Sequence, residues 1–119
     1  EWDCLAVVLE SSDHFLFYSI IGARVPEAAW SQMALFLHRA NHGLNIGNFE
    51  FDLSQGEIRF KTSLQCNVHD FSHDIFQSLV HHNVLVVDEY MPGILSIVQE
   101  SMSAEAAIMM IESHAVGDA

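Results

Sequence analysis

The sequence predicts an α+β fold, in which an antiparallel sheet of about four strands is packed by helices in the order ββαββααα. Two apolar runs near the N-terminus, separated by turn-forming residues, predict a β-hairpin. Alternating apolar and polar residues over 44–66 predict a second hairpin. Apolar positions at helical spacing between the hairpins and after residue 70 predict the helices. Because the 119 residues contain no linker, repeat or low-complexity stretch, we expect a single domain over residues 1–119.

The first hairpin comprises residues 3–10 and 15–23, which Ser11-Ser12-Asp13-His14 connect. Both runs are apolar at odd and even positions, so we expect both faces of this hairpin to be partly covered. A helix then opens at Pro26, whose missing N–H costs no hydrogen bond in the first turn, and ends at residues 41–43. Its apolar stripe consists of Ala29, Met33, Phe36, Leu37 and Ala40.

In the second hairpin the apolar phase slips by one residue at Gly47-Asn48, which predicts a β-bulge. A four-residue turn over 54–57 would set the strand register. This register predicts three cross-strand pairs: Phe51 with Phe60, Asp52 with Arg59 and Glu50 with Lys61. We therefore expect Arg59 and Lys61 to be paired on a solvated face rather than to form a ligand-binding cationic patch.

Three helices are expected after residue 70. The first follows Asp70 or Ser72 as its N-cap, and the second begins near Asn83 and continues, kinked, through Pro92 on its polar side. The third is capped by Ser103 and ends at Gly117. It buries Ala104, Ala107, Ile108, Ile111 and Ala115.

The charge balance excludes some partners. Sixteen Asp and Glu oppose four Lys and Arg, for a net charge of −12, and no Lys or Arg follows Lys61. Nucleic-acid binding and docking on an anionic membrane both need clustered cations, so we expect neither. No apolar run reaches the roughly 18 residues of a spanning helix.

The chain has eight histidines but no catalytic motif, such as a phosphate-binding Gly-rich loop, GxSxG, HExxH or CxxC. We expect no enzyme and no bound cofactor. His38/His42 and His69/His73 have i, i+4 spacing, so a metal-binding or small-ligand sensor on the His-rich acidic helices is the alternative. Cys4 and Cys66 are expected as buried free thiols in a reducing cytosol, although a disulfide stays open if their strands are neighbours.

Apolar residues exceed what one sheet and four helices can hide. Leu85, Met109 and Met110 lie off their helical stripes, and the first hairpin is apolar on both faces. Exposed Met and Leu typify partner surfaces, so these three residues are the candidate homodimer or client-binding surface. The alternative is that they fill gaps in the core.

The sequence resembles the YbjN-domain family, described as a putative bacterial sensory transduction regulator, and is similar to its cyanobacterial members. The residues that carry the resemblance are Ala40-Asn41, 45–52, 56–63, Tyr90-Met91-Pro92 and Ser103-Ala104-Glu105. Within the covered range, about Trp30 to Glu112, the match is specific at 40–63 and mainly a matter of pattern in the helices.

The resemblance implies a fold like that of type III secretion chaperones, which are small acidic α+β dimers that hold other proteins. The family has no catalytic residues to carry over. The surplus apolar surface, the strong acidity and the absence of catalytic motifs predict a non-enzymatic cytoplasmic module that binds another protein as a chaperone-like or regulatory homodimer. Family members usually have a helix before the first hairpin. Since this chain begins at the strand, we expect a YbjN-like domain without that helix.

Overall fold

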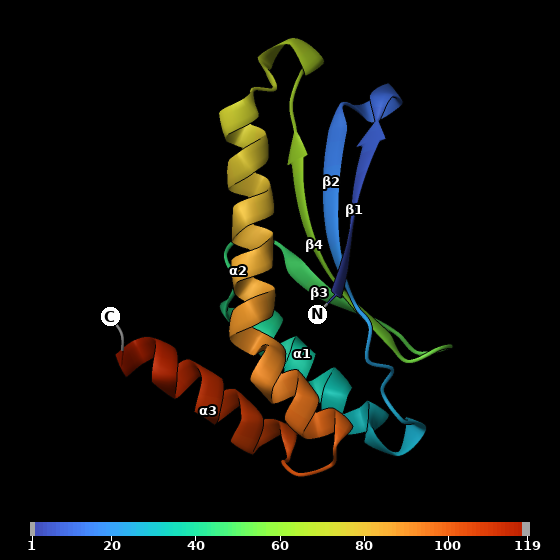
Figure 1. Cartoon of the computed structure of the whole chain (residues 1–119), viewed down its shortest axis with the longest axis vertical. Coiled ribbons are helices and arrows are strands. Elements are labelled where there is room, and N and C mark those ends of the chain that lie inside the picture. The colour runs from blue at the N-terminus through green and yellow to red at the C-terminus, as the bar shows by residue number, and fades with distance from the viewer. Residues whose placement is uncertain (1, 118–119) are drawn as a thin grey trace.

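Four antiparallel strands form one sheet in the order β1-β2-β4-β3 (Figure 1). The computed structural model describes residues 2–117, without the side chains of 68 and 114–117. The strands are β1 (Trp2–Leu9), β2 (His14–Ile21), β3 (Asn48–Asp52) and β4 (Glu57–Gln65), and the helices are α1 (Trp30–Gly43), α2 (His73–Val98) and α3 (Ala104–Gly117). Short 3-10 turns η1 (Glu10–Ser12), η2 (Glu27–Ala29) and η3 (Val68–Asp70) connect them. The α+β class and the four-stranded antiparallel sheet are confirmed, and after β4 the chain continues through the 3-10 turn η3 into helices α2 and α3.

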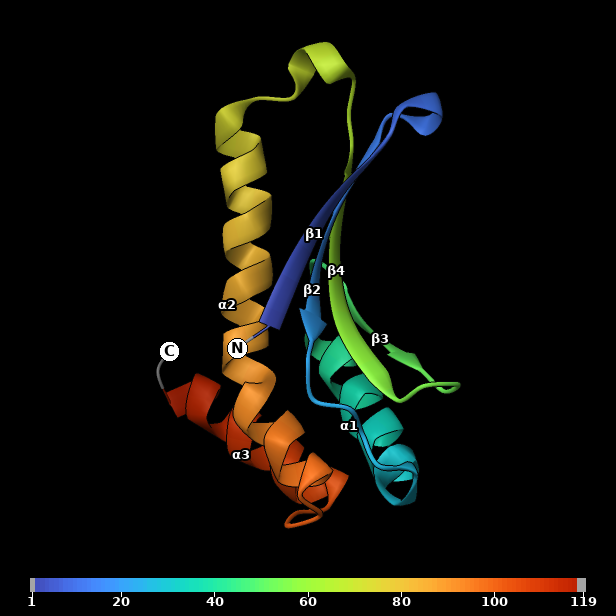
Figure 2. The ribbon, with the colours of Figure 1, turned by 45° about the vertical axis from the view of Figure 1, so that its right-hand side comes forward.

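Helices α1 and α2 pack on one face of the sheet, which we call the inner face, and α3 packs on these two helices (Figures 1 and 2). The predicted apolar stripe of α1 supplies Met33, Phe36 and Leu37 to the core. There Phe36 meets Tyr90 of α2, and Tyr90 meets Phe49 of β3. Burial of these apolar side chains is the main stabilising contribution to the packing of helix on sheet.

The first hairpin forms as predicted, but its covering differs. On β2 the inner-facing Phe17, Ser19 and Ile21 are buried, because α2 packs over them. On β1 no residue is buried, and Leu5 and Val8, which point to opposite faces, are both half exposed. The expectation that both faces are partly covered holds on β1 only at Trp2, which packs against the core on the inner face, and at Val7, which is half-buried on the outer face. The rest of β1 is exposed because this strand lies at the free edge of the sheet.

The second hairpin pairs two residues away from the predicted register. Phe49 pairs with Phe60, Glu50 with Arg59 and Asp52 with Glu57. The turn explains the shift, because Gly56 takes a left-handed φ of +72° and donates its N–H to the carbonyl of Asp52 at 2.7 Å. Leu53 is therefore part of the turn instead of pairing with Ile58. A shift of two residues keeps the side-chain parity, so the inward face was predicted correctly.

The predicted bulge at Gly47-Asn48 is absent because β3 begins only at Asn48. Gly47 lies before the strand and has a left-handed φ of +83°. Neighbouring atoms leave no room for a side chain on its Cα. A Cβ there would come within 2.8 Å of the carbonyl oxygen of Lys61. The phase slip marks the entry into the strand, where only glycine fits.

Helix α2 is one helix of 26 residues, so the start of a new helix near Asn83 is wrong. Asn83 lies inside this continuous helix, and its polar side chain forms hydrogen bonds to backbone carbonyls of the sheet. The helix also continues through Pro92, which is exposed as predicted. Ser72 caps its N-terminus by accepting from the N–H of Ile75 at 3.2 Å.

Helix α3 follows the prediction closely. Ser103 accepts from the N–H of Ala106 at 3.2 Å, as an N-cap does. Ala104, Ala107, Ile108 and Ile111 are buried, and the expected burial of Ala115 lies outside the described side chains.

Candidate functional site

An uncovered apolar area lies on the first hairpin. Paired residues of neighbouring strands point to the same face, and Leu5 pairs with Tyr18, Val7 with Leu16 and Asp3 with Ile20. We define the hairpin surface as the apolar side chains on the outer face of β1 and β2: Leu5, Val7, Leu9, Leu16 and Ile20. Leu5 and Leu9 are 50% and 43% exposed. Such a contiguous apolar area on a chain of net charge −12 is typical of a protein-binding site.

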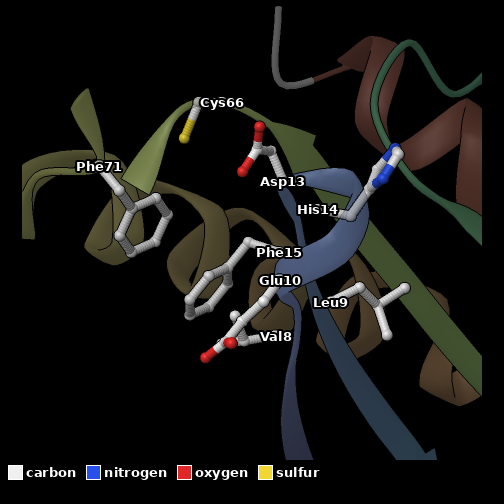
Figure 3. Close-up of a pocket in the computed structure, with 8 residues that line it drawn as sticks. All are labelled: Val8, Leu9, Glu10, Asp13, His14, Phe15, Cys66 and Phe71. Carbon is white, nitrogen blue, oxygen red and sulfur yellow. The ribbon is translucent and has the colours of Figure 1, made fainter. Parts of the chain in front are cut away.

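A groove of about 380 Å³ adjoins the hairpin surface at the tip of the hairpin (Figure 3). Phe15 and Phe71 stack on one side of it with ring centroids 4.2 Å apart, and Phe76 meets Phe15 edge-on at 5.5 Å. Figure 3 shows His14 turned away from this aromatic pair, consistent with its pairing with Leu9 on the outer face. The lining residues are Val8, Leu9, Glu10, Asp13, His14, Phe15, Cys66 and Phe71. The apolar area thus continues around the end of the hairpin, with two acids beside it.

A second groove, of about 340 Å³, runs along the N-terminal half of α2. Half-buried Phe76, Val80 and Val84 recur every four residues and form its apolar floor. His73, Gln77 and His81 complete the lining. The sequence pattern assigned Val84 to the core stripe, and in the structure this side chain is only partly exposed.

The charged part of the outer face lies on β3 and β4, beside the hairpin surface. Glu50 binds Arg59 at 2.6 Å and Lys61 at 3.2 Å. Arg59 also lies over the ring of Tyr18, 4.7 Å from its centroid. The prediction that acids on β3 engage both cations is confirmed, but one acid serves both. The predicted pairing of Asp52 with Arg59 is wrong, because Asp52 instead accepts from the Ser54 hydroxyl at 2.6 Å.

These contacts change the acidity of both carboxyl groups. Partial burial raises the pKa of Glu50, but the hydrogen bonds and charges of Lys61 and Arg59 outweigh it, so the net pKa falls below 4.5. The hydroxyl and backbone N–H of Ser54 lower the pKa of Asp52. Arg59 and Lys61 are therefore engaged within the chain and form a charged border to the hairpin surface.

The three residues proposed as a partner surface are exposed, so the alternative that they fill the core is wrong. Leu85 on α2 is 54% exposed, and Met109 and Met110 on α3 are 61% and 37% exposed. They stand on two different helices, whereas the hairpin surface gathers five apolar side chains on two paired strands. The sequence showed that the hairpin was apolar on both faces, but only the position of β1 at the sheet edge shows that it is uncovered.

Sequence reasoning also missed the role of Asn41, which was interpreted only as part of a helix stop. Its side-chain nitrogen donates to the carbonyl of Phe49 at 3.0 Å, and its side-chain oxygen accepts from the N–H of Phe49 at 2.6 Å. An amide side chain can satisfy both backbone groups in this way because it carries a donor and an acceptor side by side. Asn41 thus closes the outer edge of β3.

The histidines and cysteines do not converge in the described part of the chain. There, no group of three His, Cys, Asp or Glu side chains could hold a metal ion. His82 contacts the carbonyl of Ile46 at 3.1 Å, and His38, His42, His69 and His73 are exposed. Cys4 and Cys66 are both free thiols, because β2 separates β1 from β4. Their expected burial is wrong, since Cys4 is exposed at the sheet edge and Cys66 is only half-buried.

None of the helices over residues 2–117 combines the length and apolar character that crossing a bilayer would take. Comparison of the chain with protein-family models, with curated proteins and with solved structures finds no match.

Proposed function

We propose that this domain is a non-enzymatic protein-binding module that acts in the cytoplasm as a chaperone-like or regulatory homodimer. The observation that carries the proposal is the hairpin surface, whose Leu5 and Leu9 remain 50% and 43% exposed. The hydrophobic core lies on the other face of the same sheet. The side chains of the hairpin surface are therefore not part of the core and are available for contact with another protein. The resemblance of residues 40–63 to the YbjN-domain family supports the same assignment.

The chemistry of the surface defines the segment that it binds. Its centre is aliphatic, with the aromatic groove of Phe15 and Phe71 at one end. Glu10 and Asp13 lie at that end, within a chain of net charge −12. An apolar segment flanked by Lys or Arg satisfies both features, because opposite charges speed association while apolar contact supplies the affinity.

The chaperone-like activity is tested by light scattering from a client that aggregates when its apolar segments become exposed, such as reduced insulin. We expect the domain at equimolar concentration to suppress the scattering. Leu16→Lys alters the hairpin surface away from the sheet edge and should raise the half-suppressing concentration about tenfold, as expected for loss of one anchoring side chain. Leu35→Lys on α1, where Leu35 is 48% exposed, is the matched control and should behave like the original protein.

Circular dichroism first establishes that both variants are folded. The proposal fails if the domain does not suppress aggregation in excess over the client, or if Leu35→Lys weakens suppression as much as Leu16→Lys.

A second candidate function, small-ligand or metal sensing, is favoured by the groove on α2 that His73 and His81 line. A zinc titration of untagged protein tests it, with His81→Gln as the variant. Stoichiometric binding tighter than micromolar that is lost in the variant would support sensing, and its absence removes this candidate.

A further inference from the structure

We propose that the free edge of β1 pairs antiparallel with β1 of a second copy, joining the two four-stranded sheets into one continuous sheet. The inference rests on the proposed function, in that it takes the homodimer as given and assigns its interface. An edge strand presents unpaired N–H and C=O groups, and only another extended strand satisfies a whole row of them.

The two edges of this sheet differ in how they are protected. At one edge, β3 is five residues long, carries Asn48, Glu50 and Asp52 on its outer face, and has Phe49 closed by the Asn41 amide. At the other edge, β1 is eight residues long and contains no Pro, Gly, Lys or Arg. Within residues 2–117, the hydrogen bonds of the β1 backbone run to β2, and no side chain closes its free side. Charge, bulges, proline and covering segments are the usual protections of an edge. Among the residues that the structure describes, the only such protection on β1 is the charge of Asp3 near its N-terminal end.

Charge favours a second copy as the occupant despite the net charge of −12. From Cys4 to Leu9 the strand carries no charged side chain, so two copies can meet here without opposing acids. Asp3 and Glu10 flank this neutral stretch at its two ends. Antiparallel pairing keeps the two Asp3 carboxylates apart and brings each Asp3 to the Leu9–Glu10 end of the other strand, so acids approach one another only at the two margins of the interface.

Symmetry restricts the register. A two-fold axis perpendicular to the sheet keeps the inner face of one copy beside the inner face of the other, so residues of equal parity must pair. Two such registers use nearly the whole strand: a register centred on Ala6 pairs residues 3–9, and one centred on Leu5 pairs residues 2–8. In the first, Leu5 meets Val7 of the other copy, and in the second the two Leu5 side chains meet. Both registers cover half-exposed aliphatic groups with aliphatic groups.

The pairing also enlarges the proposed binding surface. The hairpin surfaces of the two copies become one apolar band across the two-fold axis. The Glu50, Arg59 and Lys61 cluster borders this band on each side, because β3 and β4 lie outermost in the joined sheet. A partner segment would then contact both copies at once.

Cysteine crosslinking tests the interface directly. In a Cys4→Ser, Cys66→Ser background, Leu5→Cys, Ala6→Cys, Leu35→Cys and Leu85→Cys each provide one exposed thiol. Under mild oxidation we expect a disulfide-linked dimer from Leu5→Cys or Ala6→Cys, with little from Leu35→Cys. Crosslinking mainly through Leu85→Cys would overturn edge pairing and place the dimer on the helices.

Molar mass from light scattering gives a second measurement. Leu5→Glu places an acid at the centre of either register and should weaken dimerisation at least tenfold. Leu53→Glu, at the β3–β4 turn, is the matched control because Leu53 is 60% exposed, and it should leave the dimer intact. A chain that is monomeric at all micromolar concentrations overturns edge pairing and the homodimer, whereas client binding through Leu16 is measured independently and can survive.

Discussion

Ser19 of β2 donates its hydroxyl proton to the side-chain oxygen of Asn83 in α2 across 2.6 Å, and both residues are fully buried. The side-chain nitrogen of Asn83 donates to the carbonyls of Phe17 and Phe60 and to the hydroxyl of Thr62, at 3.0–3.1 Å. One amide therefore ties α2 to both central strands of the sheet. Because apolar packing alone lets a helix slide by a turn, this polar contact fixes where α2 lies.

Asn83→Leu should lower the free energy of unfolding by about 2–4 kcal/mol, because it leaves Ser19, Thr62 and two carbonyls with lost partners in the interior. Urea denaturation measures the loss. Ser19→Ala removes only one of these hydrogen bonds and should cost about 1–2 kcal/mol. Equal losses in the two variants would contradict the central role of Asn83.

Gly93→Ala tests how closely α2 and α1 approach. A Cβ at Gly93 would lie 2.6 Å from the Phe36 ring, which is fully buried and has no space to move. We expect a loss of about 1–3 kcal/mol despite the better helix propensity of alanine. Gly22→Ala is the control, since a Cβ there meets no atom within 4 Å. Thermal unfolding should separate the two variants clearly, and equal melting temperatures would refute the close contact.

Asn41→Ala should open the β3 edge. The N–H and carbonyl of Phe49 both lose the Asn41 amide, and we expect a loss of about 1–3 kcal/mol. Hydrogen exchange should also become faster at the Phe49 amide. Asn45→Ala is the matched control, because Asn45 is an exposed asparagine between α1 and β3. This change should leave the Phe49 amide protected from exchange.

Glu50 gives the fold a small dependence on acidic pH. Its pKa is lower in the folded state than the ordinary 4.5, so its ionised form adds stability that is present above about pH 4.5 and lost as the pH falls through the folded pKa. Glu50→Gln should cost under about 1 kcal/mol at neutral pH, because Arg59 and Lys61 are partly solvated. The difference from the original protein should shrink in 1 M salt and vanish at low pH, and a constant difference would point to packing instead.

Tyr90 should govern alkaline unfolding. Burial, followed by the charges of Glu112 and Glu89, raises its pKa from 10.0 to about 12. A raised folded pKa means that stability is fully present below pH 10 and is lost between pH 10 and about 12. Over that window the loss should reach roughly 2–3 kcal/mol, the equivalent of two pKa units. Tyr90→Phe removes the titrating group, so its denaturation midpoint should fall less steeply with alkaline pH.

Much of the fold followed from local pattern. Hairpin positions, the stripe of α1, the caps Ser72 and Ser103 and the passage of α2 through Pro92 each depend on spacing and on the chemistry of a few residues. The errors occurred where the backbone or side chain of a residue forms hydrogen bonds that the local sequence pattern does not reveal. Asn83 is a residue type that favours the start of a helix, but here it lies inside one because its side chain forms hydrogen bonds to the sheet. Gly56 shifts the turn that sets the β3–β4 register.

The candidate site was likewise predicted only in part from the sequence. Residue pattern alone predicted that the first hairpin is apolar on both faces, that Leu85, Met109 and Met110 lie off their stripes, and that Arg59 and Lys61 face acids. Which apolar residues stay uncovered could not be predicted from pattern, because exposure depends on which strand lies at the edge and on how the helices pack on the sheet. The strand order β1-β2-β4-β3 places β1 at the edge of the sheet, where its exposed apolar side chains form the proposed interface.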